Sequence, residues 1–115
     1  MVPLSVVVAT TQAWPELRMC LDSLHEQAVA ERAELLVVDG HGQGLPDDAL
    51  RCYPQVTRLQ MMGASVLQMR AFAMSHSHGE IVAITEDHCR VAPDWCRRII
   101  QAHREHPDAA VIGGV

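Results

Sequence analysis

The stretch that decides the fold is residues 79–89, which read Gly-Glu-Ile-Val-Ala-Ile-Thr-Glu-Asp-His-Cys. Residues 81–84 are a short, continuous apolar run, which is typical of a strand buried on both faces of a parallel sheet. Glu86, Asp87 and His88 follow at its carboxyl end, the edge at which open α/β sheets bind ligands. Three ionisable side chains there indicate a divalent cation that carries a phosphate-bearing ligand. The alternative is a solvated acidic loop before the next helix.

Four other stretches have the composition of strands. Residues 4–10 (Leu-Ser-Val-Val-Val-Ala-Thr) and 34–39 (Glu-Leu-Leu-Val-Val-Asp) are mostly apolar and β-branched, which predicts two more buried strands. Residues 56–62 predict a weaker strand, and residues 109–112 predict a last one.

Helix signals lie between these strands. Pro15 suits the first position of a helix. Residues 47–52 predict a short helix, and a last helix begins at Pro93 and Asp94 and ends at Pro107. The apolar face of the first helix comprises Leu17, Cys20, Leu21, Leu24 and Ala28.

A capping box predicts the remaining helix. Ser65 and Gln68 have the spacing of that motif, and the helix they begin should run to about His78 and stop at Gly79. Strands that alternate with helices require a parallel sheet with right-handed crossovers. The predicted fold class is therefore α/β, a three-layer α/β/α arrangement around a mainly parallel sheet.

Composition and charge exclude several classes of protein. The chain has 115 residues, 49% hydrophobic and 20% charged, as in one globular domain with a single core. A net charge of −5 and an aromatic content of 3% argue against a nucleic-acid partner. No apolar run reaches the roughly 18 residues of a membrane span. The cysteines lack Cys-X-X-Cys spacing, which fits free thiols in a reducing, cytoplasmic setting.

The familiar motifs of α/β enzymes are missing from the sequence. Residues 9–14 (Ala-Thr-Thr-Gln-Ala-Trp) lack the glycines of a dinucleotide fingerprint, and neither a P-loop nor a Gly-X-Ser-X-Gly elbow occurs. A receiver-like signalling domain would need acidic residues after the first strand and a late lysine, and this sequence has Thr10-Thr11 and no lysine.

What remains is a set of polar residues that the predicted topology brings to one edge of the sheet. Thr10 and Thr11 end the first strand, Asp39 ends the second, and Arg70 lies in the helix that leaves the third. With residues 86–88, they suit an activated nucleotide whose diphosphate needs a guanidinium and a cation. The alternatives are that Asp39 only caps a loop and that Arg70 is a solvated charge.

Three segments make the sequence similar to a known family. Residues 4–11 with 17–27, the latter ending Ser-Leu-His-Glu-Gln, match the first strand and helix of family 2 glycosyltransferases of the inverting GT-A class. Residues 34–40 (Glu-Leu-Leu-Val-Val-Asp-Gly) match the second strand, and residues 79–89 followed by Pro-Asp-Trp match the metal-motif strand and the helix after it. The chain resembles the amino-terminal half of that family's fold, the Rossmann-like half that binds the nucleotide.

The resemblance implies roles for particular residues. Thr10 or Thr11 and Asp39 would contact the donor's nucleobase and ribose, and Arg70 would lie near the diphosphate. Asp87 would match the last aspartate of the Asp-X-Asp motif, which holds Mg²⁺ or Mn²⁺ against the diphosphate and offsets the charge on the leaving group.

Three positions depart from the family pattern. Thr85 replaces the first aspartate of the metal motif, so Glu86 and His88 would complete the ligand set, and an imidazole favours Mn²⁺ over Mg²⁺. Gly40 replaces the second aspartate after the second strand, and Ala71 replaces an asparagine after the helix arginine. The catalytic base and acceptor pocket belong to the family's later half, so no residue here is assigned as the base.

The sequence thus predicts one domain, residues 1–115, that binds a nucleotide-diphospho-sugar and is truncated relative to the full glycosyltransferase domain. The parent enzyme would transfer a hexosyl-type sugar from this donor to an unknown acceptor by a metal-assisted, inverting reaction. The alternative is a catalytically silent α/β fragment that self-associates as a homodimer through an open sheet edge.

Overall fold

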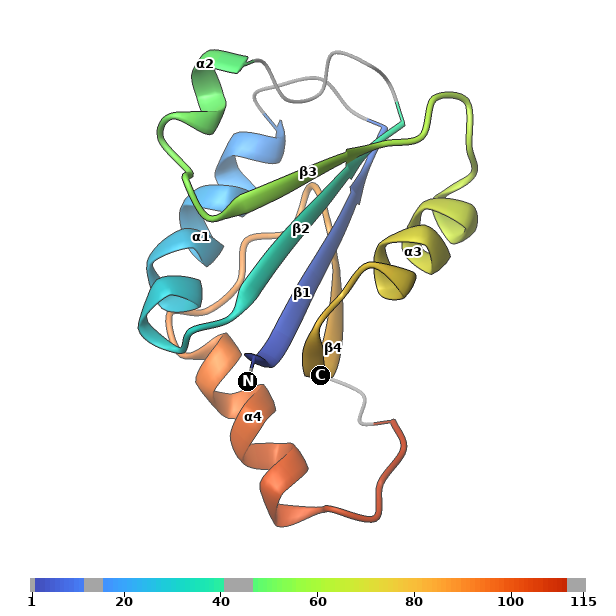
Figure 1. The fold of residues 1–115 in the computed structure, drawn as a ribbon. Helices are drawn as coiled ribbons and strands as arrows, with labels where there is room; N and C mark the ends of the chain where they lie inside the picture. The colour runs from blue at the N-terminus through green and yellow to red at the C-terminus, as the bar shows by residue number, and fades with distance from the viewer. Residues whose placement is uncertain (1, 12–15, 41–46, 112–115) are drawn as a thin grey trace.

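The computed structural model describes residues 2–11, 16–40 and 47–111 (Figure 1). Pro15, where the first helix was expected to begin, and the glycine-rich residues 41–46 lie outside the described residues. The elements in chain order are β1 (Val2–Thr10), α1 (Glu16–Ala30), β2 (Glu34–Asp39), α2 (Asp47–Leu50), β3 (Val56–Gln60), α3 (Val66–Ser75), β4 (Gly79–Glu86) and α4 (Trp95–Glu105).

The strands form one parallel sheet in the order β3-β2-β1-β4. Parallel strands of this kind end at the same edge, so the residues that follow them converge. In the register, Thr10 of β1 is opposite Asp39 of β2, and Ala9 of β1 is opposite Glu86 of β4. The central strand β1 therefore determines how the ends of its two neighbours are aligned.

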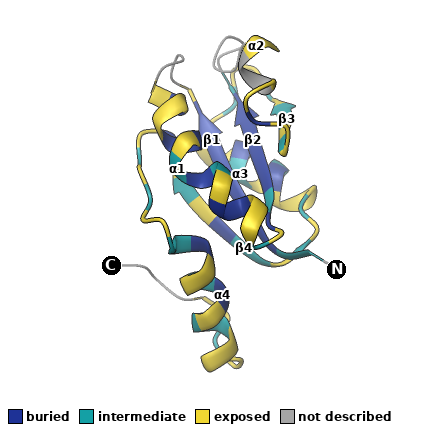
Figure 2. Ribbon diagram, turned by 90° about the vertical axis from the view of Figure 1, so that its left-hand side faces the viewer, coloured by how far each residue is buried: buried dark blue, intermediate teal, exposed yellow. Residues whose placement is uncertain are grey.

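Helices cover both faces of the sheet, which confirms the expected three-layer α/β/α fold (Figure 1). Figure 2 shows that β1 and β2 are largely buried, whereas the outer face of α4 is exposed. The face under α1 and α4 is built on Leu4, Val6, Val8, Leu17, Leu21, Leu24, Leu35, Val37, Cys96 and Ile100. The face under α3 is built on Val7, Ala9, Leu36, Val38, Met69 and Ala73.

The expectation that residues 81–84 are buried on both faces was wrong. Among the described strands β4 lies at the edge of the sheet and pairs with β1 alone. Only Ala83 of this strand is buried, and the side chain of Ile84 is 43% exposed. Periodicity cannot distinguish a central strand from an edge strand when both carry the same apolar run.

The end of α3 also differs from the prediction. The helix ends at Ser75 with His76 as its C-cap, not near His78. Ser75 and Ser77 donate side-chain hydrogen bonds to the carbonyls of Phe72 and Met74, and such local bonds compete with continued helix. The capping box is confirmed, because Ser65 Oγ accepts from Gln68 N–H while the Gln68 side chain accepts from Ser65 N–H.

Residues 109–111 are not a strand, so the expected last strand does not begin where it was predicted. Ile112, its final residue, lies outside the described part of the chain.

Gly79 is required at the amino end of β4 by a close approach to β1. A Cβ at this position would lie 2.4 Å from Ser5 N and 2.6 Å from the Leu4 carbonyl carbon. The peptide N–H of Gly79 also donates to Ser5 Oγ at 2.8 Å. The sequence suggested that Gly79 ends a helix. In the structure it is instead a point of close contact between β1 and β4.

Replacing Gly79 by alanine should force these two strands apart. We expect Gly79→Ala to lower the free energy of unfolding by about 1–3 kcal/mol, the usual cost of overpacking. Gly63→Asn is the control, because a Cβ at Gly63 meets nothing within 4 Å and asparagine tolerates its positive φ of 72°. Urea denaturation measures both, and equal effects would contradict the steric explanation.

The side chain of Glu34 connects the amino ends of β1, β2 and β4 through hydrogen bonds. Its carboxylate accepts hydrogen bonds from Ser5 Oγ at 2.8 Å and from the His78 backbone N–H at 2.9 Å, and it lies 2.8 Å from His78 Nδ1. Burial alone raises the pKa of Glu34, but the hydrogen bonds from His78 and Ser5 outweigh it and lower the pKa below the ordinary 4.5.

A carboxylate whose pKa is lowered by folding stabilises the protein above its unfolded pKa. This contribution is lost as the pH falls from about 4.5 through the lower, folded pKa. We expect Glu34→Gln to lower the free energy of unfolding at pH 7 by about 1 kcal/mol and to flatten its decline in acid. Denaturation at a series of pH values tests this, and an unchanged acid slope would contradict it.

Candidate functional site

The carboxyl edge of the sheet brings Thr10, Asp39 and Asp87 together. Thr10 and Asp39 are the last residues of adjacent strands and are opposite each other in the register. The hydroxyl Oγ1 of Thr10 donates a hydrogen bond to Asp87 Oδ2 at 2.9 Å, across 77 residues of sequence. The strands therefore deliver these side chains to one rim, as the topology predicted.

Both rim carboxylates are buried: Asp39 is 1% exposed and Asp87 is 7% exposed. Burying a carboxylate is costly unless hydrogen bonds or opposite charges compensate. The bond from Thr10 to Asp87 supplies part of that compensation and fixes the direction of the carboxyl group. The rim is thus a preformed pair of acidic groups at the place where this class of sheet binds ligands.

The last residue of β4, Glu86, begins a tight turn whose side chains differ in direction and exposure. The backbone N–H of Cys89 donates to the carbonyl of Glu86 at 3.0 Å. Within this turn Asp87 points into the protein, whereas the side chains of Glu86 and His88 are 53% and 65% exposed. His88 Nε2 lies 2.9 Å from Glu86 Oε2, and its Nδ1 lies 3.5 Å from Asp87 Oδ1.

Arg70 and Thr11 occupy less constrained positions. Thr11 is exposed directly after β1. Arg70 is half-buried in the second turn of α3, and its Nε is buried without a hydrogen-bond partner among the described residues.

The structure explains why glycine follows Asp39. A Cβ at Gly40 would lie 2.7 Å from Met69 Sδ and 3.1 Å from Met69 Cε. Met69 is fully buried and anchors α3 on the sheet. A second aspartate at this position would require the end of the Met69 side chain to shift.

The sequence model described as Glycosyl transferase family 2 matches residues 5–115. The chain belongs to this family. No curated protein matches its sequence.

Solved structures similar to this family 2 chain share its fold. Residues 1–349 of TarS from S. aureus superimpose with a TM-score of 0.75 at 18% identity, over 91% of this chain and 33% of that one. The mannosyltransferase PcManGT from Pyrobaculum calidifontis, in complex with GDP-Man and Mn²⁺, gives a TM-score of 0.72 at 23% identity, over 90% and 33%. The chain thus spans about a third of each of these structures, and the expected GT-A type of α/β fold is confirmed.

No helix in the described residues 16–40 and 47–111 is both long enough and apolar enough to cross a bilayer.

Sequence reasoning missed the residues of α1 that hold the loop after the rim in place. Gln27 Nε2 donates to the Ala92 carbonyl at 2.8 Å, and its Oε1 accepts from Cys96 N–H at 2.8 Å. One turn earlier, Ser23 Oγ accepts from Val91 N–H at 3.1 Å. These two side chains are the first and last residues of the Ser-Leu-X-X-Gln segment that resembles the family. The signal in the sequence was a glutamine on the buried face of an amphipathic helix.

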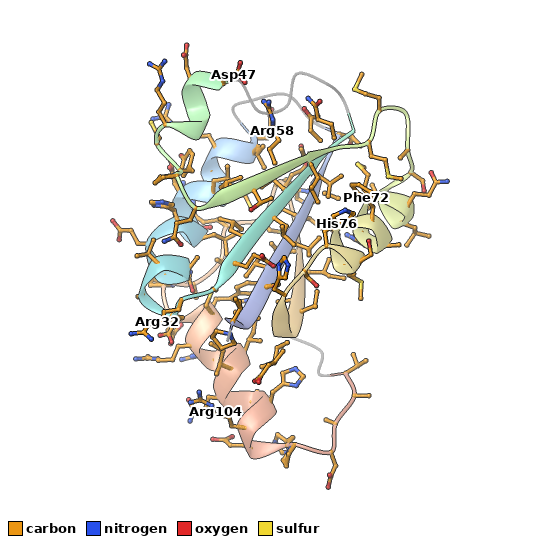
Figure 3. All side chains as sticks on the ribbon, in the orientation of Figure 1. Arg32, Asp47, Arg58, Phe72, His76 and Arg104 are labelled. Atoms are coloured by element: carbon orange, nitrogen blue, oxygen red, sulfur yellow. The ribbon has the colours of Figure 1, made fainter. Side chains whose placement is uncertain are left out.

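Cys20 extends the same face of α1 to the turn itself. Its thiol donates to the Glu86 carbonyl at 3.5 Å. Burial, followed by the nearby Cys89 and Asp87, raises the pKa of Cys20 to about 12, so it remains a neutral thiol at physiological pH. At a more exposed position, Arg58 Nη1 of β3 lies 3.0 Å from Asp47 Oδ1 of α2; both residues are labelled in Figure 3.

Removing the amide of Gln27 should loosen the loop between β4 and α4. We expect Gln27→Ala to lower the free energy of unfolding by about 1–3 kcal/mol, because it leaves the buried N–H of Cys96 unpaired, whereas the Ala92 carbonyl still accepts from Trp95 N–H. Gln101→Ala is the matched control: Gln101 is exposed on α4 and its side chain bonds Glu105, so its loss should cost within about 0.5 kcal/mol. Equal effects in chemical denaturation would contradict this role.

Proposed function

We propose that residues 1–115 form the nucleotide-diphospho-sugar binding domain of an inverting glycosyltransferase, which transfers a hexosyl-type sugar to an acceptor not yet identified. One observation carries the proposal: Thr10 is opposite Asp39 in the register and hydrogen-bonded to Asp87, at the ligand-binding edge of the sheet. Family membership and the sugar-nucleotide complex of PcManGT support it.

Each predicted donor-binding residue has a part in holding the donor. Thr10, Thr11 and Asp39 contact the nucleobase and ribose with hydroxyl and carboxylate groups. Arg70 contacts the diphosphate, since it lies in the second turn of the helix that follows β3 and guanidinium groups bind phosphate oxygens in a bidentate manner. None of these residues is assigned as the base that activates the acceptor.

A divalent cation is part of the proposal. Asp87, Glu86 and His88 would hold Mn²⁺ or Mg²⁺, since they lie at the end of β4 and the His88 ring is 2.9 Å from Glu86 Oε2 and 3.5 Å from Asp87 Oδ1. The ion supplies charge that offsets the negative charge of the departing nucleoside diphosphate. The Mn²⁺ in the PcManGT complex and the imidazole of His88 favour Mn²⁺.

The free thiols of the chain agree with a cytoplasmic setting. Cys20, Cys52, Cys89 and Cys96 are all unpaired by disulfides, and such thiols persist in reducing compartments.

A second candidate is a silent domain that self-associates through β4. This strand lies at the edge of the described sheet, and a groove of about 660 Å³ lined by Ile81, Ile84 and Ile100, among others, runs along it. Exposed apolar edge strands are templates for pairing between chains. Sedimentation at several concentrations separates the candidates: dimerisation without nucleotide affinity favours the second.

Calorimetric titration with GDP and UDP, with and without Mn²⁺, tests the donor site. We expect Mn²⁺ to strengthen binding about tenfold or more, which corresponds to about 1.4 kcal/mol. Asp87→Asn should remove this metal-dependent gain. Asp108→Asn is the control, because Asp108 is exposed beyond the end of α4. Nucleotide affinities that change neither with Mn²⁺ nor with Asp87→Asn would refute the proposal.

A further inference from the structure

Cys89 has no part in the proposed function, yet its thiol lies beside the metal-binding residues. One ligand atom from each of Glu86, His88 and Cys89 lies within 4.8 Å of the other two. These three side chains offer an oxygen, a nitrogen and a sulfur at a half-exposed surface beside the rim. A carboxylate, an imidazole and a thiol in one cluster are the donors that zinc sites use.

The backbone explains why these donors converge. The bond from Cys89 N–H to the Glu86 carbonyl at 3.0 Å closes a turn, and closure places its first and fourth residues side by side. The Cys20 thiol holds the same carbonyl from beneath at 3.5 Å. Asp87 is directed inward to Thr10, so the other three side chains of the turn remain on its outer side.

His88 is oriented as metal-binding histidines commonly are. Its Nε2 faces Glu86 Oε2 at 2.9 Å, within the cluster, while its Nδ1 faces Asp87 Oδ1 at 3.5 Å on the other side of the ring. A histidine ligand usually donates its second ring N–H to a carboxylate, which fixes the tautomer and makes the ligating nitrogen more basic. In this arrangement Asp87, itself held by Thr10, would be that carboxylate and not the direct ligand that it is in the Mn²⁺ or Mg²⁺ site proposed above.

We propose that Glu86, His88 and Cys89 form a three-ligand site for a thiophilic divalent cation, with Zn²⁺ the best match and Mg²⁺ disfavoured. A thiolate and a carboxylate balance the two positive charges of the ion, and the neutral imidazole adds a third ligand. Mg²⁺ prefers oxygen ligands in octahedral geometry, whereas Zn²⁺ accepts sulfur and nitrogen in tetrahedral geometry. Ligand atoms around zinc are about 3.3–3.8 Å apart, as its bond lengths require, so small side-chain rotations close the cluster.

Three protein ligands leave one tetrahedral position open, as in catalytic rather than structural zinc sites. A role for this ion in binding the donor diphosphate would rest on the proposed function. The binding of the metal itself does not, because it requires no nucleotide.

Titration of the chain with Co²⁺ alone, in a phosphine reductant, tests the site. Cobalt bound to a thiolate gives a charge-transfer band in the near ultraviolet, which oxygen and nitrogen ligands do not give. We expect this band to appear, to be removed by Zn²⁺, and to persist in excess Mg²⁺. Binding should also release a proton from the thiol, measurable by calorimetry in buffers of different ionisation enthalpy.

Cys89→Ser should abolish the band and weaken Zn²⁺ binding by at least about 10–100-fold, the loss that even outer-shell substitutions cause. Cys52→Ser is the matched control, because Cys52 is an exposed free thiol away from the turn, and it should change neither. For a readout independent of substitutions, cadmium-113 NMR of the unaltered chain should show one sulfur ligand.

A band that survives Cys89→Ser, no band at all, or Zn²⁺ binding no tighter than Mg²⁺ would overturn the inference. These results are separate from the donor test: nucleotide binding without a cobalt–thiolate band leaves the proposed function intact and removes the zinc site. A cobalt–thiolate band without nucleotide binding supports the zinc site and contradicts the proposed function.

Discussion

The hydrogen bond between Thr10 and Asp87 is the contact on which the candidate site depends. It joins the end of the central strand to the turn after β4, and it orients a carboxyl group that is almost fully buried. A hydrogen bond to a charged acceptor contributes about 1.5–3 kcal/mol. Thr10 is also opposite Asp39 in the register, so one residue adjoins both rim carboxylates.

The surroundings of the rim are held by side chains that do not face it. Met69 fills the space that Gly40 leaves open and docks α3 against the sheet. On the other face, Cys20, Ser23 and Gln27 of α1 bond the backbone between Glu86 and Cys96. Interactions of this kind, made by packed helices rather than loops, are what hold a binding site in a fixed geometry.

Much of the fold could be predicted from the sequence. The apolar runs of β1 and β2 and the capping box of α3 are local signals, and the structure has them where they were predicted. The predictions that went wrong depend on non-local contacts. The exposure of Ile84 depends on whether a strand lies beyond β4, and the role of Gly79 depends on how closely Ser5 approaches. Neither feature can be inferred from the residues that are adjacent in sequence.

The sequence by itself determined the alternation of strands and helices, and therefore that Thr10, Asp39 and Asp87 would reach one edge, because parallel strands share their carboxyl end. Only the tertiary structure decided how those residues are used. Packing and the turn after β4 send Asp87 inward to Thr10 and bring Cys89 to Glu86 and His88. The physical reason is that hydrogen bonds and close packing act between residues far apart in sequence, and residue pattern alone carries no information about their distances.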